Sequence, residues 1–343
     1  MKIRFLLALL FATTYAFAQE TAKHIHVSKP GTLPSELTLE EAQKITKLTL
    51  TGTINAIDFK HLRDDFSELE ELDLKNVSIK FYAGKQGPYT DRFYVYPNNC
   101  IPAYAFSFPD STFNREVKLK EVILSNKIKN IEDCAFKDLS SLAVVRLTKR
   151  TPPNLLKEAI SPKNTAVFVP LGTSDTYRSK KNWSRFALLE GDPVTVHVQV
   201  GQMSSLEREL QQLNVHPKEI HFLTIAGKLE AEDFELIRDY MPNLVNVDLT
   251  ETTALEIPEY TFTQKKYLLK IALPKGLVSI KQRAFSGCIR LSGTLVLPST
   301  LSGIEFGAFM GCESLEELLV TGQPLLTLGE QALEGTSIKI RNK

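Results

Sequence analysis

The chain has 343 residues, and its 41 Lys and Arg against 40 Asp and Glu give a formal net charge of +1. This balance provides no electrostatic footprint for a polyanion, so nucleic acid is excluded as an expected partner. With 43% hydrophobic residues the chain is globular rather than disordered, and its 4 cysteines are too few for a disulfide scaffold.

The first eighteen residues have the pattern of a secretory signal peptide. Lys2 and Arg4 form a basic start, residues 5–12 are an unbroken apolar run, and Ala16, Phe17 and Ala18 supply a small-x-small cleavage site. The apolar run is much shorter than the roughly 20 residues that span a bilayer. We therefore expect a cleaved export signal, no membrane span, and a mature protein that is periplasmic, cell-surface or secreted.

The rest of the chain contains an internal duplication. Residues 45–74 match residues 220–249 without a gap at an offset of 175, with twelve identical pairs in thirty positions. The sequence therefore predicts two tandem modules with a boundary near residues 191–193. The expected division is a signal peptide over 1–18, a first module over 19–191 with a terminal cap over 165–190, and a second module over 192–343.

A shorter unit of about 24 residues repeats inside each copy. The pattern I-x-x-x-A-F-x-x-C-x-x-L occurs at residues 280–291 and again at 304–315. A unit this short cannot bury its own apolar face, so the units must stack into a solenoid with a continuous core. We predict an α/β solenoid in which each coil gives one short parallel strand. Expected strand positions are Leu72–Leu74, Val122–Leu124 and Leu295–Leu297.

Short helices are expected to cap the N-terminal side of each array. Thr38-x-x-Glu41 and Ser204-x-x-Glu207 both have the spacing of a capping box, in which a hydroxyl and a carboxylate satisfy free backbone N–H groups. Exposed ends of a solenoid need such covering elements.

The repeat pattern resembles the BspA-type leucine-rich repeat, found in exported proteins of Gram-negative anaerobes and of some protists. The segment Thr165–Gly172, followed by Tyr177, Trp183 and Phe186, is similar to the terminal element that closes such arrays. The resemblance covers nearly all of residues 24–340. It implies an exported or surface-exposed binding solenoid, often described as adhesin-like, with no catalytic residues to carry over.

The first copy carries an aromatic insertion over residues 80–99 that the second copy lacks. A shorter insertion follows between Phe106 and Leu119. The candidate ligand contacts are Phe81, Tyr82, Tyr89, Phe93, Tyr94, Tyr96, Phe108 and Phe113. Exposed Tyr and Phe give large contact area at low entropic cost, as at a recognition patch. The alternative is that these rings pack on the flank of the solenoid and hold a hairpin such as Arg92–Tyr96 in place.

Two Thr–Asp pairs recur at the repeat spacing. Thr49 and Asp73 are 24 residues apart, as are Thr224 and Asp248. Each pair should lie on adjacent strands, facing outward and within cross-strand reach. The pairs are either a structural Thr–Asp contact or part of a polar, ligand-binding strand face.

The sequence shows no catalytic, cofactor or metal motif. H-E-x-x-H, G-x-S-x-G, G-x-x-x-x-G-K-[ST] and G-x-G-x-x-G are all missing, and the carboxylates are scattered through repeat positions. His24-x-His26 has weak metal spacing and is expected to face solvent. Cys288 and Cys312 share a repeat position and are expected to be buried thiols, with a disulfide as the alternative.

These observations predict an exported, non-enzymatic binding protein that recognises a protein or host-surface ligand. The strand face and the aromatic insertion are the expected contact surfaces. Glycan capture by exposed tyrosine rings is a second binding hypothesis. The alternative outside the class of binding proteins is a structural or scaffold role in the cell envelope. The repeat leaves this alternative open because a repeat predicts a fold far better than a ligand.

Overall fold

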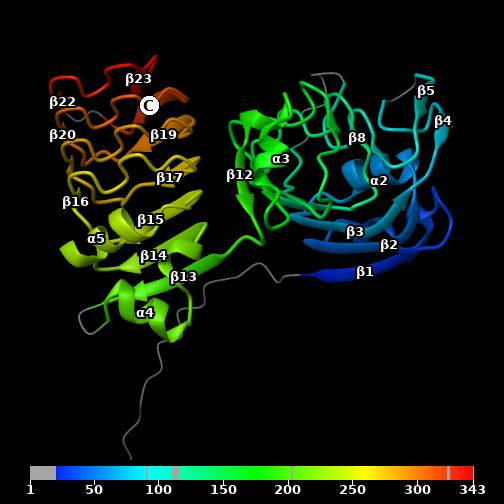
Figure 1. Ribbon diagram of the computed structural model, residues 1–343, viewed down its shortest axis with the longest axis horizontal. Helices are drawn as coiled ribbons and strands as arrows, with labels where there is room; N and C mark the ends of the chain where they lie inside the picture. The colour runs from blue at the N-terminus through cyan, green and yellow to red at the C-terminus, as the bar shows by residue number, and fades with distance from the viewer. Residues whose placement is uncertain (1–20, 90–91, 110–115, 202–203, 323–324, 343) are drawn as a thin grey trace, which may run out of the picture.

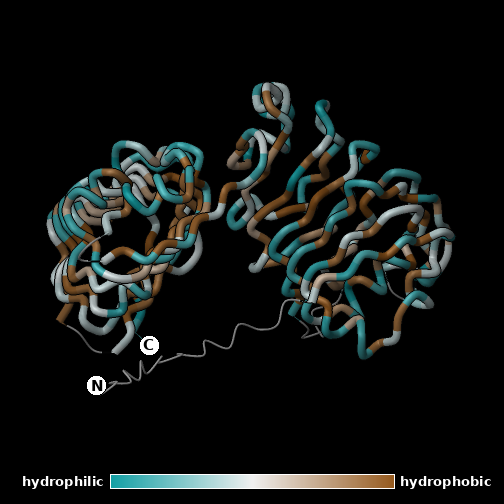
Figure 2. The backbone as a smooth tube through the Cα atoms, turned by 90° about the horizontal axis from the view of Figure 1, so that it is seen from below, coloured by the Kyte–Doolittle hydropathy of each residue, from teal (hydrophilic) through white to brown (hydrophobic). Residues whose placement is uncertain are grey.

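The computed structural model describes residues 21–89, 92–109, 116–201, 204–322 and 325–342. Successive coils add parallel strands side by side, so the predicted α/β solenoid of short coils in two tandem arrays is confirmed (Figure 1). The expected signal peptide over residues 1–18 lies outside the described residues. Figure 2 shows hydrophobic residues recurring along the backbone of both arrays. The buried ones form the core of the coils.

The N-terminal array (residues 21–192) is built on a seven-stranded parallel sheet. Its strands, in spatial order, are β1 (Ala22–Val27), β2 (Lys47–Ile54), β3 (Glu71–Ile79), β7 (Glu121–Leu124), β9 (Val144–Leu147), β11 (Ala166–Val169) and β12 (Ala187–Glu190). The opposite side of the coils carries β6 (Cys100–Ile101), β8 (Asn130–Ile131) and β10 (Asn154–Leu155). Its helices are α1 (Leu39–Ala42), α2 (Ala56–Asp65) and α3 (Ser174–Arg178), with 3-10 turns η1 (Leu33–Ser35) and η2 (Trp183–Arg185).

The C-terminal array (residues 193–342) repeats this plan. One side carries β13 (Thr195–Val200), β14 (Phe222–Gly227), β15 (Asn246–Thr252) and β17 (Lys270–Ala272), then β19 (Gly293–Leu297), β21 (Leu315–Val320) and β23 (Lys339–Asn342). The other side carries β16 (Glu256–Ile257), β18 (Ser279–Ile280), β20 (Gly303–Ile304) and β22 (Thr327–Leu328). Its helices are α4 (Leu206–Gln212) and α5 (Ala231–Tyr240), with the 3-10 turn η3 (Pro217–Glu219).

The repeated phenylalanines form a stacked ladder in the core. The ring centroids of Phe262 and Phe285 lie 5.2 Å apart, those of Phe285 and Phe309 lie 5.1 Å apart, and both pairs are nearly parallel. The thiols of Cys288 and Cys312 donate to the carbonyls of Phe262 and Phe285. All four cysteines are free, so the prediction of buried thiols at this repeat position is confirmed.

Aromatic packing ends the N-terminal array at residues 165–190. Tyr177, Trp183 and Phe186 are buried against one another. The Tyr177 hydroxyl donates to the Lys149 carbonyl at 2.6 Å, and the Trp183 indole N–H donates to the Pro153 carbonyl at 2.8 Å. These two bonds attach the last turn to the coil that precedes it.

One of the two predicted capping boxes is in place and the other is displaced by one residue. Thr38 and Glu41 form the expected reciprocal pair at α1. At α4 the N-cap is Ser205, whose hydroxyl accepts from the Arg208 N–H. The prediction of Ser204 is wrong because its backbone pairs with Gly201 and its hydroxyl donates to Glu209.

The two arrays meet at a shared apolar cluster. Outward-facing side chains of β9, β11 and β12 pack against residues that begin the coils of the C-terminal array. The cluster consists of Val144, Ala166, Phe168, Ala187, Leu189, Val245 and Leu269. Lys270 Nζ donates to the Ser140 carbonyl at 3.0 Å, and Arg290 Nη1 donates to the Arg185 carbonyl at 2.7 Å. The outward face of these three N-terminal strands is therefore occupied by the second array.

Candidate interaction surfaces

The aromatic insertion folds into an antiparallel hairpin of β4 (Tyr82–Gly84) and β5 (Tyr94–Tyr96). Its tyrosines contact one another: ring centroids lie 6.1 Å apart for Tyr82 and Tyr96, 4.9 Å for Tyr94 and Tyr96, and 5.6 Å for Tyr89 and Tyr94. Tyr89 also contacts Tyr104 at 5.0 Å. We call the side formed by Tyr82, Tyr89, Tyr94 and Tyr96 the tyrosine face of the hairpin.

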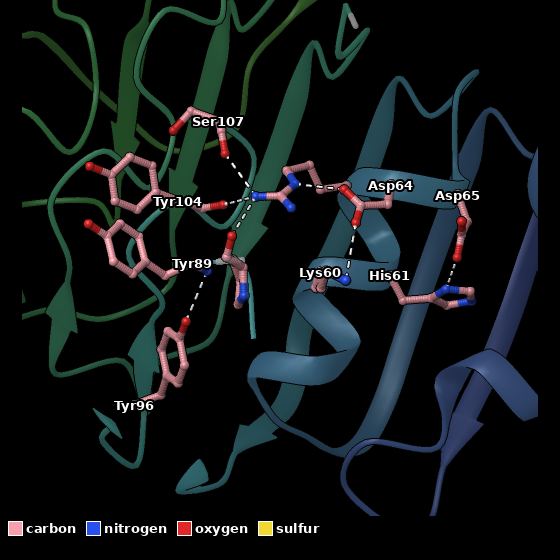
Figure 3. A network of polar contacts seen from close by, with 10 residues as sticks. Lys60, His61, Asp64, Asp65, Tyr89, Tyr96, Tyr104 and Ser107 are labelled. Atoms are coloured by element: carbon pink, nitrogen blue, oxygen red, sulfur yellow. Dashed lines mark hydrogen bonds and ion pairs between the residues drawn. The ribbon is translucent and has the colours of Figure 1, made fainter. Parts of the chain in front are cut away.

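Tyr96 fixes the position of the hairpin. Its side chain is only 2% exposed, and its hydroxyl accepts from the Tyr89 N–H at 3.0 Å (Figure 3). Burial raises the pKa of Tyr96 to about 12. Gly87 lies directly against the ring, since a Cβ at that position would be 2.4 Å from a Tyr96 ring carbon. Tyr96 is therefore a packed residue of the hairpin.

Arg63 of α2 anchors both insertions. The buried guanidinium donates from Nη1 to the carbonyls of Pro88 at 2.9 Å, Tyr104 at 3.0 Å and Ser107 at 3.0 Å (Figure 3). The half-buried Phe108 ring lies 4.5 Å from the guanidinium carbon. An arginine that satisfies three carbonyls keeps these buried backbone groups paired. The second copy carries the same arginine, Arg238, at the offset of 175, but this match in the sequence does not reveal what Arg63 binds.

The opposite side of the hairpin is apolar and exposed. Phe81 is 54% exposed and Phe93 is 65% exposed, and Val95 is exposed beside them. Phe81 directly precedes β4, Phe93 directly precedes β5, and Val95 lies within β5 between the two tyrosines of that strand. We call Phe81, Phe93 and Val95 the phenylalanine face. The last of the eight aromatic candidates, Phe113, lies outside the described residues.

The strand-face pairs have the predicted register. Thr49 lies opposite Asp73, and Thr224 lies opposite Asp248, on adjacent parallel strands. Each carboxylate bonds to the backbone of its own strand, two residues further on. Asp73 accepts from the Lys75 N–H at 2.7 Å, and Asp248 accepts from the Thr250 N–H at 2.9 Å. Among the hydrogen bonds of the described residues, none joins either Thr to its Asp.

A groove of about 670 Å³ lies on the strand face of the C-terminal array. Residues from β13, β14, β15, β17 and β19 line it, and the N-terminal array closes one side. Its polar and small lining residues include Thr195, His197, Thr224, Asn246, Asp248, Lys270, Ala272 and Thr294, with Ser140 and Asn164 from the N-terminal array. A smaller groove of about 390 Å³ on the N-terminal array includes Asp73 and Arg146. Thr49 lines neither groove.

The polar groups of the larger groove differ in whether they have a hydrogen-bond partner within the protein. The Lys270 amine donates a hydrogen bond to the Ser140 carbonyl, and burial lowers the pKa of Lys270. Oδ1 of Asn246 is enclosed and accepts no hydrogen bond from a described residue. An unpaired buried amide oxygen is costly.

The part of the chain that the structure describes contains no group of three or more His, Cys, Asp or Glu residues placed to hold a metal ion. His24 and His26 are exposed on β1, and His26 Nδ1 lies 2.9 Å from the Thr51 hydroxyl. Within the same described ranges, no helix is long and apolar enough to cross a bilayer.

The chain is similar to known leucine-rich-repeat proteins. The model of the BspA type leucine rich repeat region matches six copies, over residues 98–155 and 239–342. A solved leucine-rich repeat protein from Bacteroides ovatus is 13% identical, with 88% of this chain and 84% of that chain covered and a TM-score of 0.30. One from Eubacterium ventriosum is 14% identical, with 86% and 78% covered and a TM-score of 0.27. No curated protein gave a significant match. The six matched copies identify the repeats over residues 98–155 and 239–342 as BspA-type leucine-rich repeats.

Proposed function

We propose that the protein is an exported, non-enzymatic and adhesin-like binding protein whose ligand is another protein. The ligand lies in the groove of about 670 Å³ on the strand face of the C-terminal array. This groove is the observation that carries the proposal, because five strands and the junction with the N-terminal array contribute to one concave surface. Extended concave faces are the surfaces through which solenoids bind.

The phenylalanine face is the second contact in this proposal. Two exposed rings on an ordered hairpin offer contact area that loses little entropy on binding. Glycan stacking has less support, since the tyrosine rings that would receive a sugar face one another instead. A purely structural role explains the buried Tyr96 but gives no reason for Phe81 and Phe93 to remain exposed.

We also propose that the signal peptide over 1–18 is followed by two modules, 19–191 and 192–343. Two separate apolar clusters support this division, one confined to residues up to 188 and the other beginning at residue 196. Export is supported by the basic start, the apolar run and the cleavage site of the first eighteen residues.

The test is a pull-down with the mature chain, from residue 19, against outer-membrane and host extracellular fractions. Asp248→Lys places a long cation in the groove, and Asp73→Lys makes the same change at the matched position of the first copy. We expect a captured protein that is lost with Asp248→Lys, retained with Asp73→Lys and weakened with Phe81→Ser/Phe93→Ser. A protein retained equally by all three variants would contradict the proposal.

A further inference from the structure

A second groove, of about 850 Å³, lies at the N-terminal end of the C-terminal array. It is bounded by α4, α5 and η3, and Figure 1 shows α4 at this end of the array below β13. Leu210, Val215 and Leu236 form an apolar floor that is packed against the core. Tyr240 stands exposed at the side. The groove is thus a depression between helices whose base is hydrophobic.

The rim of this groove is acidic. The exposed carboxylates around it are Glu207, Glu219, Glu232, Glu235 and Asp239, and its lining includes no Lys or Arg. Arg238 beside the groove pairs with Asp239 at 2.9 Å and lies 3.9 Å from Glu235. Among the described residues, no ion pair joins Glu219 or Glu232 to a cation. Net negative charge therefore remains over an apolar base.

The duplication shows that the fold does not require this charge. At the offset of 175, Glu232 and Glu235 of α5 correspond to Ile57 and Lys60 of α2. Both helices have ten residues and both carry a buried aspartate that accepts backbone N–H groups near the first turn, Asp58 and Asp233. The two helices have the same length and the same capping aspartate, so the fold does not account for the acidic residues that only α5 carries.

We propose that this groove binds a basic amphipathic segment of a partner protein. Apolar side chains of the segment would cover the half-buried Val215 and Leu236, while its Lys and Arg residues would meet Glu219 and Glu232. A helix laid into a groove is recognised in this way, with apolar anchors on one face and complementary charge at the rim. The site shares no lining residue with the strand-face groove, so it stands or falls independently of the proposed function.

The proposal is tested by fluorescence anisotropy with a labelled peptide of about sixteen residues, Leu at i, i+3, i+4 and i+7 and Lys elsewhere. The reference peptide has Glu in place of Lys. Glu232→Ile/Glu235→Lys imports the residues of the first copy into α5, and Ile57→Glu/Lys60→Glu makes the reverse exchange in α2. Circular dichroism and melting temperature verify that both variants remain folded.

We expect saturable binding of the Lys peptide to the wild-type chain, weakened by added salt and undetectable for the Glu peptide. Glu232→Ile/Glu235→Lys should weaken it about tenfold, whereas the reverse exchange in α2 leaves it unchanged. Leu236→Ser should also weaken binding of the Lys peptide. A purely electrostatic site would bind the peptide equally well with or without this leucine. Equal binding of both peptides, equal loss in both exchange variants, or full displacement by spermine at equal charge concentration would overturn the proposal.

Discussion

Acid should weaken the junction between the two arrays, because it protonates a buried histidine. His221 accepts the Val194 N–H at Nδ1, at 3.1 Å, and its ring meets Phe168 edge to face at 4.9 Å. Burial lowers the pKa of His221 from its usual 6.5 to about 4. The unfolded chain therefore binds the proton more readily between these pH values, and the free energy of unfolding falls as the pH falls through this window.

The size of the effect follows from the two pKa values. One pKa unit corresponds to about 1.4 kcal/mol, so the protein should lose about 2 kcal/mol by pH 5 and about 3 kcal/mol by pH 4 from this histidine. His221→Phe removes the titration but leaves the Val194 N–H without its acceptor, at a cost of about 1 kcal/mol. The variant should be less stable than wild type at pH 7 and more stable at pH 4.

The assay is urea unfolding of wild type and His221→Phe at pH values from 7 to 4. Circular dichroism follows both arrays, and fluorescence of Trp183, the single tryptophan, follows the N-terminal array. Other groups that titrate in acid contribute equally to both proteins, so the difference between them isolates His221. If the two stability curves ran parallel across this range, the reasoning about the buried imidazole would be refuted.

Three further predictions concern the backbone, the hairpin and the thiols. Gly227→Ala should lower the free energy of unfolding by more than about 1 kcal/mol, because φ is +95° and a Cβ would lie 1.9 Å from the Val200 carbonyl oxygen. The measurement is the melting temperature. The control is Gly303→Ala, where a Cβ meets nothing within 4 Å. Replacing Tyr89, Tyr94 and Tyr96 by Ser should lower the melting temperature, whereas the same change at Phe81 and Phe93 should not; equal melting temperatures for both would contradict the packing described. In thiol titration, the half-buried Cys134 should react first and the three buried cysteines only after denaturation. Four thiols that react rapidly in the native protein would exclude this order.

The repeat spacing predicted most of the fold because it reflects the core directly. Leu72–Leu74 lies in β3 and Val122–Leu124 lies in β7, since apolar residues that alternate with polar ones face the inside of each coil. The register of Thr49 with Asp73 followed from the same 24-residue period. A solenoid places residues one period apart on neighbouring strands, so sequence distance translates into spatial distance.

The surfaces were less predictable because they depend on contacts between distant residues. The aromatic richness of the insertion was visible in the sequence, but which rings pack and which stay exposed depends on how the hairpin lies against the coils. Phe168 reads as an ordinary strand residue until its contact with Phe222 of the second array is known. The acidic groove left one sequence signal, the exchange of Ile57 and Lys60 for Glu232 and Glu235 between otherwise matched helices.

The shared cluster at the junction has a consequence for the solubility of each half. Val144, Phe168 and Leu189 face outward from their own sheet and are buried in a cluster that includes Val245 and Leu269 of the neighbouring array. A preparation of residues 19–191 alone would turn these side chains toward water as one contiguous patch. Such patches promote self-association of isolated domains. Detergent-free work on the isolated N-terminal half therefore calls for polar residues at these positions, whereas the intact chain keeps them buried.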